Sequence, residues 1–350
     1  MPYRKHWKWI LMIVLLVALN LFSRDGERVE SIYAQGIYPK VSSFFQFLFG
    51  WLPFSAGDIA YSLLIIFLIV SLFRFIKAFS KSEQKWQSLL MALQKLALGI
   101  CWFWIFFQLA WGLNYDRPSI PKRYAMDRSL VRSTEIDSFA VRMLAGVIQF
   151  APHRGSDSLL LNKALQVKGS HGVKPSSFGV VGNYMGYSGY FNPLTGEAQV
   201  NTHMPAFTLP FTAAHESAHQ DGEARESDAN FIGFLKAMES KDSTILYSAH
   251  LEMFLYANGA IRQEDSTRAK YLFTKLPLVA QKDIKAYRAF LKKYQGPIDE
   301  ATTWFYTRFL QFNNQPEGMR SYDKGMVYVM RWNQQIGEYH SSKPKLSRQF

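Results

Sequence analysis

Long apolar runs are concentrated in the first third of the chain. They cover residues 9–22, about 59–76 and about 96–113, and each contains few or no charged side chains. An apolar helix of about 20 residues crosses the hydrocarbon core of a bilayer. The pattern therefore predicts three transmembrane helices. Burial of these runs as core helices of a soluble protein is the alternative, and their low charge argues against it.

A shorter aromatic segment, residues 44–54, lies between the first run and the second. Gly50 and Pro53 break this segment, which predicts an interfacial or re-entrant piece rather than a further crossing. No small-x-small cleavage pattern follows the first run, so we expect it to be an uncleaved anchor and not a signal peptide.

Beyond residue 132 the hydrophobic pattern changes to that of a folded domain. Apolar residues recur at helical spacing in the segment that begins at Ser133. Residues 178–201 are rich in Gly, Tyr and Val and predict a β-hairpin, with Glu197 to Thr202 as an edge strand. Further helices are expected at about 231–239, 245–258, 281–294, 299–312 and 324–335.

These patterns divide the chain into four parts. Residues 1–115 form a membrane domain, 116–132 a proline-containing linker, 133–340 the folded domain and 341–350 a polar tail. The predicted fold class is mainly α, with three N-terminal transmembrane helices followed by a mostly helical domain that carries a small hairpin.

Composition agrees with this division and limits the kinds of partner that we expect. Apolar residues make up 48% of the chain and aromatic residues 16%, which suits a protein that is partly embedded in a bilayer. The formal net charge is +13, but the basic residues flank apolar runs or are scattered among acidic ones. A nucleic-acid partner is therefore not expected. Cys101 is the only cysteine, so no intrachain disulfide can form.

The basic residues also bear on orientation. Arg4, Lys5 and Lys8 precede the first apolar run and favour a cytoplasmic N-terminus. Three crossings would then place the folded domain outside the cytoplasm. Arg117 and Lys122 follow the third run and argue against this orientation, although the first helix usually dominates.

The candidate chemistry lies between Thr212 and Phe231. His215 and His219 are four residues apart, so on a helix both imidazoles leave the same face and can bind one metal ion. Glu216 leaves the helix about 100° from His215 and can act as a general base without being a ligand. This is the H-E-x-x-H pattern of zinc hydrolases, and we expect Zn²⁺ as the cofactor.

A catalytic zinc site needs a third protein ligand. Glu223 would lie about 12 Å along a continuous helix from His215, too far to share one ion. Gly222 lets the chain turn as a left-handed cap. Glu226 then becomes the predicted third ligand, and Asn230, one helical turn later, the acceptor that orients a ligand histidine.

Two resemblances rest on these residues. The E-x-x-A-N that begins at Glu226 resembles the third-ligand helix of the membrane-embedded prenyl-protein proteases and their bacterial heat-shock relatives, whose first Glu binds zinc. P-F-T-A-A-H-E-S-A-H-Q-D-G-E-A-R-E-S-D-A-N-F from Pro210, together with T-G-E-A-Q-V-N from Thr195, resembles an uncharacterised bacterial family of three-helix membrane proteins, domain of unknown function 3810. The second resemblance implies a zincin-like site in the bacterial cytoplasmic membrane and extends weakly to Gln315 and Tyr322.

The sequence thus predicts a membrane-anchored, gluzincin-like zinc metallopeptidase that acts on a peptide or protein substrate. Tyr322 is the candidate donor to the oxyanion, with Tyr247 and His250 as weaker candidates. The alternative is a non-catalytic membrane protein with a structural or sensory metal site. A transporter or channel would need polar residues within the spans, and Gln108 alone gives little support for one.

Overall fold

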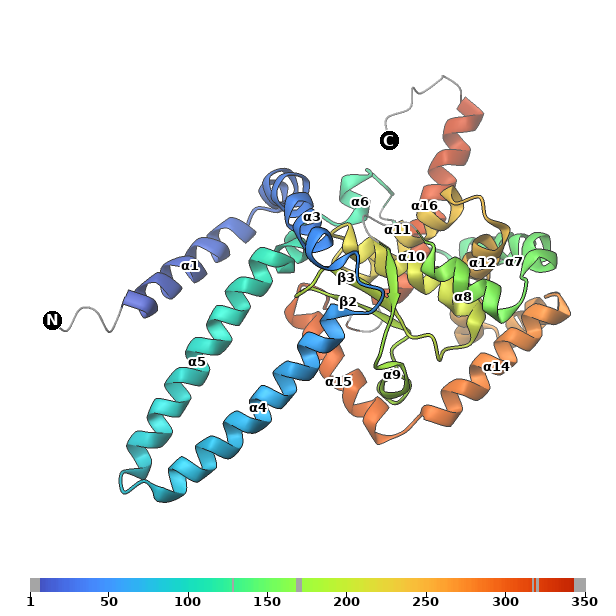
Figure 1. The fold of residues 1–350 in the computed structure, drawn as a ribbon. Coiled ribbons are helices and arrows are strands. Elements are labelled where there is room, and N and C mark those ends of the chain that lie inside the picture. The colour runs from blue at the N-terminus through green and yellow to red at the C-terminus, as the bar shows by residue number, and fades with distance from the viewer. Residues whose placement is uncertain (1–6, 128, 168–171, 317, 319–320, 343–350) are drawn as a thin grey trace. The chain divides into compact units, whose positions relative to one another are not determined.

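We analysed a computed structural model of the chain, which describes residues 7–342 except 128, 168–171, 317 and 319–320. The described chain is mainly helical, as predicted (Figure 1). It divides into two compact units. The first contains Met1–Arg117 and Asn192–Glu197, and the second contains Pro118–Phe191 and Ala198–Phe350.

The first unit contains the apolar helices predicted for the membrane. Two of them, α4 and α5, are long and apolar enough to cross a bilayer, and the bent pair Trp7–Ser23 and Gly26–Phe49, with a 99° bend, could be a third crossing. By length and composition there are therefore two candidate spans, or three if the bent pair counts as one. The elements of the unit are α1 (Trp7–Ser23), α2 (Gly26–Arg28), the π-helical η2 (Val29–Ile37), α3 (Tyr38–Phe49), α4 (Ala56–Lys81), α5 (Lys85–Ala110) and the 3₁₀ turn η3 (Gly112–Asp116).

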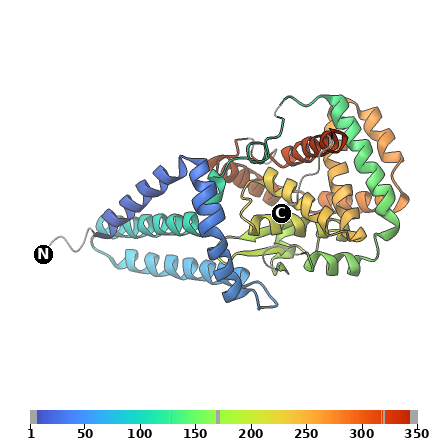
Figure 2. The ribbon, with the colours of Figure 1, turned by 90° about the horizontal axis from the view of Figure 1, so that it is seen from above.

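Helices α4 and α5 form a hairpin joined by residues 82–84 (Figures 1 and 2). Their large apolar side chains are mostly exposed; Phe67 is 64% exposed and Phe73 68%. Long apolar helices with exposed side chains are typical of segments that face lipid, because a helix satisfies its backbone hydrogen bonds internally. The exposure of these side chains therefore agrees with membrane association.

A buried carboxylate completes the N-terminus of α4. Glu197, from the tip of the hairpin, accepts hydrogen bonds from the backbone N–H groups of Ala56 at 3.1 Å and Gly57 at 2.7 Å. The Thr195 hydroxyl donates to the same carboxylate at 2.8 Å. The first amides of a helix lack intrahelical partners and carry partial positive charge, so an ionised carboxylate stabilises this end. The T-G-E part of the T-G-E-A-Q-V-N segment thus has a structural role.

The second unit is built from helices around a small sheet. Its helices are α6 (Ile120–Arg123), α7 (Ser133–Phe150), α8 (Asp157–Leu165), α9 (Gly179–Met185), α10 (Leu209–Gln220), α11 (Glu226–Glu239), α12 (Ser243–Glu264), α13 (Ser266–Thr274), α14 (Leu278–Tyr294), α15 (Pro297–Phe312) and α16 (Ser321–Ser342). Helix α6 falls within the segment expected to be a linker, and its Ile120 is buried in the core. The predicted polar tail lies outside the described residues from 343 onward.

The sheet has three strands in the order β1-β3-β2. β1 (Val173–Pro175) pairs in parallel with β3 (Glu197–Val200), and β2 (Gly189–Asn192) is the other neighbour of β3. The predicted hairpin is present as β2 and β3. The prediction that Glu197 to Thr202 forms an edge strand was wrong, because β1 pairs with β3 and leaves β2 at the edge.

Several element boundaries differ from the prediction. The helix with the histidines begins at Leu209, three residues before Thr212. Helix α9 occupies part of the segment predicted to be extended, and α13 was not predicted. The helix predicted from Ser133 is present as α7 and buries Phe139 and Met143.

Helix α10 lies at the centre of the second unit (Figure 1). All of its residues are buried, and it packs against α8, α11 and α12. Small side chains such as Ala213, Ala214 and Ala218 allow this close packing. Gly233 of α11 approaches the α10 backbone so closely that a Cβ there would lie 2.9 Å from the His215 backbone nitrogen. The polar side chains of α10 are therefore held in the core.

Candidate metal centre

A tight turn joins the helix with the two histidines to the helix with Glu226. Helix α10 ends at Gln220, and Gly222 adopts a left-handed conformation with φ +88°. The Gly222 N–H donates to the His219 carbonyl at 3.0 Å, and the Glu223 N–H donates to the Ala218 carbonyl at 3.1 Å. These two bonds form a Schellman motif, in which glycine avoids the strain of a side chain at positive φ. The turn brings α11 back beside α10.

This turn brings three side-chain atoms of His215, His219 and Glu226 together. The two histidine Nε2 atoms are 3.1 Å apart. Glu226 Oε2 lies 3.1 Å from Nε2 of His215 and 3.4 Å from Nε2 of His219. Ligands of a tetrahedral zinc ion at ordinary bond lengths are about 3.3 Å from one another. The three atoms therefore have the spacing of a zinc ligand set.

The other nitrogen of each histidine faces an acceptor. Nδ1 of His215 is 2.8 Å from Asn230 Oδ1, and Nδ1 of His219 is 2.6 Å from the carbonyl oxygen of Glu223. Since both acceptors are oxygens without a proton, each Nδ1 carries the hydrogen and donates it. Nε2 of each ring then faces the Glu226 carboxylate. Three lone pairs that meet at one point require a cation between them, either a proton or a metal ion.

Glu226 is ionised in this setting. Its side chain is buried, and burial alone would raise the pKa of the carboxyl. The neighbouring His219 and His215 outweigh burial and lower this pKa below its ordinary value. The three atoms thus combine two imidazole nitrogens with one carboxylate oxygen, a donor set that suits a divalent zinc ion.

The Glu216 carboxyl lies next to the two histidines, close enough to belong to the same cluster. Ligand atoms of His215, Glu216 and His219 all lie within 4.8 Å of one another. Among the described residues, Glu216 Oε2 is buried and has no hydrogen-bond partner. Burial raises the pKa of Glu216 to about 8, helped by the charge of Glu226 and opposed by His215. A carboxyl with a pKa near neutrality can both accept and return a proton.

Two contacts to Glu226 come from distant parts of the chain. The Tyr306 hydroxyl of α15 donates to Glu226 Oε1 at 2.5 Å, and Gln315 Oε1 accepts from the Glu226 backbone N–H at 3.0 Å. Gln315 lies within the weak extension of the family resemblance, whereas no local pattern singles out Tyr306. Contacts of this kind fix the direction of a ligand carboxylate.

An ion pair between Arg123 and Glu223 stabilises the turn. The Arg123 guanidinium donates to Glu223 Oε1 at 2.9 Å and to Oε2, and it lies 3.7 Å from Asp228 Oδ2. The Glu223 carboxylate is thus held away from the ligand set, while its carbonyl oxygen faces His219. The contribution of Glu223 to the site is its backbone, in keeping with its exclusion as a ligand.

The other predicted site residues lie elsewhere. The side chain of Tyr322 lies outside the part of the chain that the structure describes, so its predicted role as oxyanion donor is untested. The Tyr247 hydroxyl donates to Asp283 at 2.8 Å within the core. The His250 ring packs against Phe150. Neither of these two weaker candidates is placed to act as the donor.

One family comparison covers the segment that contains this cluster. The family described as "Protein of unknown function (DUF3810)" matches residues 33–330, which is most of the chain. The chain belongs to this family. In this DUF3810 protein, the match covers α4, α5 and the whole cluster of His215, Glu216, His219 and Glu226. Searches of curated proteins and of solved structures give no match.

Proposed function

We propose that this DUF3810 protein is a membrane-anchored, zinc-dependent peptidase with a zincin-like site. The observation that carries the proposal is the triangle of His215 Nε2, His219 Nε2 and Glu226 Oε2, with side lengths of 3.1, 3.1 and 3.4 Å. Glu216 lies beside this triangle with an unpartnered oxygen. A ligand set with an adjacent free carboxylate is the arrangement that metal-assisted hydrolysis requires.

A bound zinc ion supplies a Lewis acid, which polarises a peptide carbonyl and lowers the pKa of water to about 7. Glu216 accepts the proton of the attacking water at Oε2 and later returns it to the leaving amine. Asn230 and the Glu223 carbonyl hold the two imidazoles in the tautomer with Nε2 unprotonated. Tyr306 holds the second oxygen of Glu226, so that Oε2 stays directed at the histidines.

The edge strand supports a peptide as the substrate. β2 is at the edge of the sheet, and a Cβ on its Gly189 would lie 2.8 Å from Glu216 Oε1. An extended peptide can add to the edge strand of a sheet by backbone hydrogen bonds. A peptide bound along β2 would pass directly beside the proposed general base. The experiment that tests the function is cleavage of a peptide library by the zinc-loaded full-length chain in detergent.

We further propose that the chain is a multi-pass protein of the bacterial cytoplasmic membrane with its second unit outside the cytoplasm. Arg4, Lys5 and Lys8, which precede the first apolar run, support this orientation. The two candidate spans α4 and α5, with the bent pair as a third, support membrane anchoring.

Replacement of Tyr306 by phenylalanine is expected to weaken zinc binding by about tenfold, the lower end of the effect seen when a partner of a metal ligand is removed. The change deletes the hydrogen bond to Glu226 Oε1 and keeps the ring. Competition with a chromogenic chelator measures the affinity. Tyr271→Phe is the control, because Tyr271 is 51% exposed on α13. Equal affinities for the two variants would show that Tyr306 has no role in the site.

Zinc binding is expected to release a proton from Glu216. In the metal-free chain the pKa of Glu216 is raised to about 8, so the carboxyl is mostly protonated at pH 7. A nearby divalent cation favours the ionised form and lowers this pKa. The wild-type chain should therefore release about one proton more per zinc at pH 7 than Glu216→Gln. Calorimetry in buffers of different ionisation enthalpy measures the difference, and equal release would contradict the placement of Glu216 beside the ion.

A further inference from the structure

An exposed apolar stripe runs along α15. Ile298 is 57% exposed, Phe305 68%, Phe309 38% and Phe312 73%. Their spacing of seven, four and three residues places them on one side of a helix. Trp304, at 56% exposure, flanks the stripe. Large aromatic side chains seldom gather on the surface of a soluble domain without a partner.

Helix α9 extends this apolar surface. Val180 and Val181 are 54% and 53% exposed, and Tyr184 is 46% exposed. The two helices are neighbours (Figure 1), since a Cβ on Gly186, which ends α9, would lie 2.5 Å from Asp299 Oδ1 of α15. The α9–α15 surface comprises Val180, Val181, Tyr184, Met185, Ile298, Trp304, Phe305, Phe309 and Phe312.

The composition of this surface fits the interface of a bilayer. Trp and Phe beside a cationic side chain are typical of helices that lie in the headgroup region. The guanidinium of Arg308 lies 5.7 Å from the centre of the Trp304 ring, where it can also reach lipid phosphate. The stripe itself contains only apolar side chains.

The candidate spans also anchor the second unit to a bilayer. Residues 111–117 lead from the end of α5, a candidate span, to the second unit, and the chain returns to the first unit at Asn192–Glu197. Because the candidate spans anchor the chain in a membrane, lipid is always close to the second unit. We therefore choose lipid, rather than an unidentified protein, as the partner of this surface.

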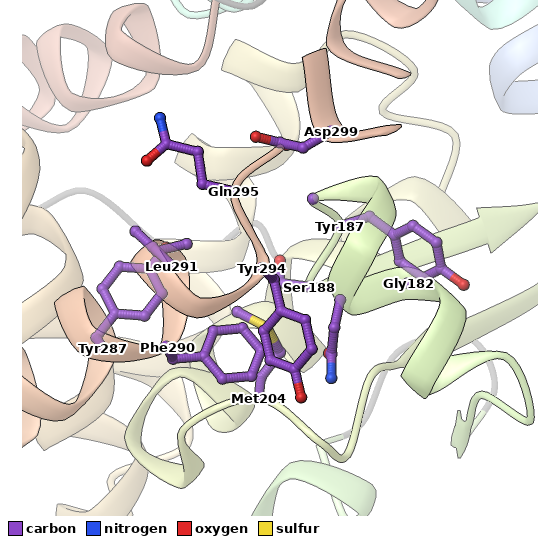
Figure 3. Close-up of a pocket in the computed structure, with 12 residues that line it drawn as sticks. Gly182, Tyr187, Ser188, Met204, Tyr287, Phe290, Leu291, Tyr294, Gln295 and Asp299 are labelled. Carbon is purple, nitrogen blue, oxygen red and sulfur yellow. The ribbon is translucent and has the colours of Figure 1, made fainter. Parts of the chain in front are cut away.

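The same helices border a cavity of about 350 Å³. Tyr287, Phe290, Leu291 and Tyr294 of α14 lie together on one side, and Asp299 lies at another (Figure 3). Ser188 also lines the cavity, and the next residue, Gly189, is the one that approaches Glu216. The cavity, bordered by α9 and by Asp299 of α15, therefore has at one side the residue that precedes the strand beside the proposed general base.

Helix α15 contributes both to the exposed surface and to the metal centre. Its Tyr306 points inward and donates to Glu226, while Phe305 and Phe309 on either side of it in sequence are exposed. We infer that the α9–α15 surface docks on the lipid headgroup region and that the substrates are membrane-proximal segments of polypeptides. The docking stands on the surface alone, whereas the substrate class rests on the proposed peptidase function.

Spin labels on the full-length chain in nanodiscs of phosphatidylethanolamine and phosphatidylglycerol test the docking. Cys101→Ser removes the native thiol, and Phe305→Cys supplies the labelling site. Leu278→Cys is the control, because Leu278 is 75% exposed at the far end of α14. We expect the label at 305 to be relaxed by lipid-dissolved oxygen and shielded from an aqueous nickel chelate. The label at 278 should show the opposite preference.

Two results would overturn the docking. If the nickel chelate relaxes the label at 305 as strongly as the label at 278, residue 305 faces water and not lipid. If neither oxygen nor the nickel chelate relaxes the label at 305, residue 305 is covered by protein and not by lipid. Unchanged thermal unfolding and zinc content of the labelled variants show that each has folded.

The substrate class has its own test. Ile298→Glu combined with Phe305→Glu is expected to lower cleavage of a peptide anchored in the nanodisc and to leave cleavage of the same peptide in solution unchanged. Equal loss for both peptides would contradict the inferred substrate class. If the wild-type chain cuts neither peptide while the label at 305 remains in lipid, the peptidase proposal fails and the docking stands.

Discussion

The chain with His219 replaced by alanine is expected to be purified with almost no zinc, against about one ion per wild-type chain. The change removes one corner of the ligand triangle and leaves only His215 and Glu226. Two ligands hold zinc far more weakly than three, and the buried Glu223 carbonyl also loses its donor. Elemental analysis of the purified full-length protein after dialysis measures the metal content.

His203→Ala is the matched control for this experiment. His203 is an exposed loop residue on the second unit and lies outside the ligand set. We expect this variant to keep the wild-type zinc content. If His203→Ala and His219→Ala retain equal amounts of zinc, the ion is not held by the H-E-x-x-H helix, and the proposed function is lost with it.

Glu216→Gln is expected to retain zinc and to lose turnover by about 10²–10⁴-fold, the usual contribution of a general base. Glutamine has nearly the same shape as glutamate, but its amide cannot accept and return the proton. Because Glu216 is not among the three ligand atoms at 3.1 to 3.4 Å, the metal should stay bound. The cleavage rate of a library peptide, measured beside zinc content, separates the two effects.

Glu239→Gln controls for the loss of a carboxylate on the same unit, since Glu239 is exposed at the end of α11. Turnover by this variant should equal that of wild type. A zinc-loaded wild-type chain that cuts no peptide would favour the alternative, a structural or sensory metal site. Full activity of Glu216→Gln would leave hydrolysis in place but assign the proton transfer to another residue.

Local geometry explains which parts of the site could be predicted. The spacing of His215 and His219 and the turn at Gly222 follow from the dimensions of a single helix and its end, so the residues themselves carry the information. The same holds for the long apolar helices α4 and α5. Patterns that depend on neighbours in the sequence are readable without a structure.

Contacts between distant residues explain the rest. β3 is central because it pairs with Val173–Pro175, which no local pattern connects to it. Tyr306 lies 80 residues after Glu226, so only the packing of α15 brings them together. The sequence predicts an extended segment where α9 lies, because its β-branched and glycine residues, Val180, Val181 and Gly182 among them, favour strands and turns over helices.

The compact turn at Gly222 also has a consequence for biosynthesis. Every donor atom of the cluster lies within residues 215–226, so all of them leave the ribosome almost together. At about 5–20 residues per second, Tyr306 follows Glu226 after about 4–16 s, given the 80 residues between them. A nascent chain can therefore bring these side chains together before α15 has been made, and Tyr306 then joins a cluster that has already formed.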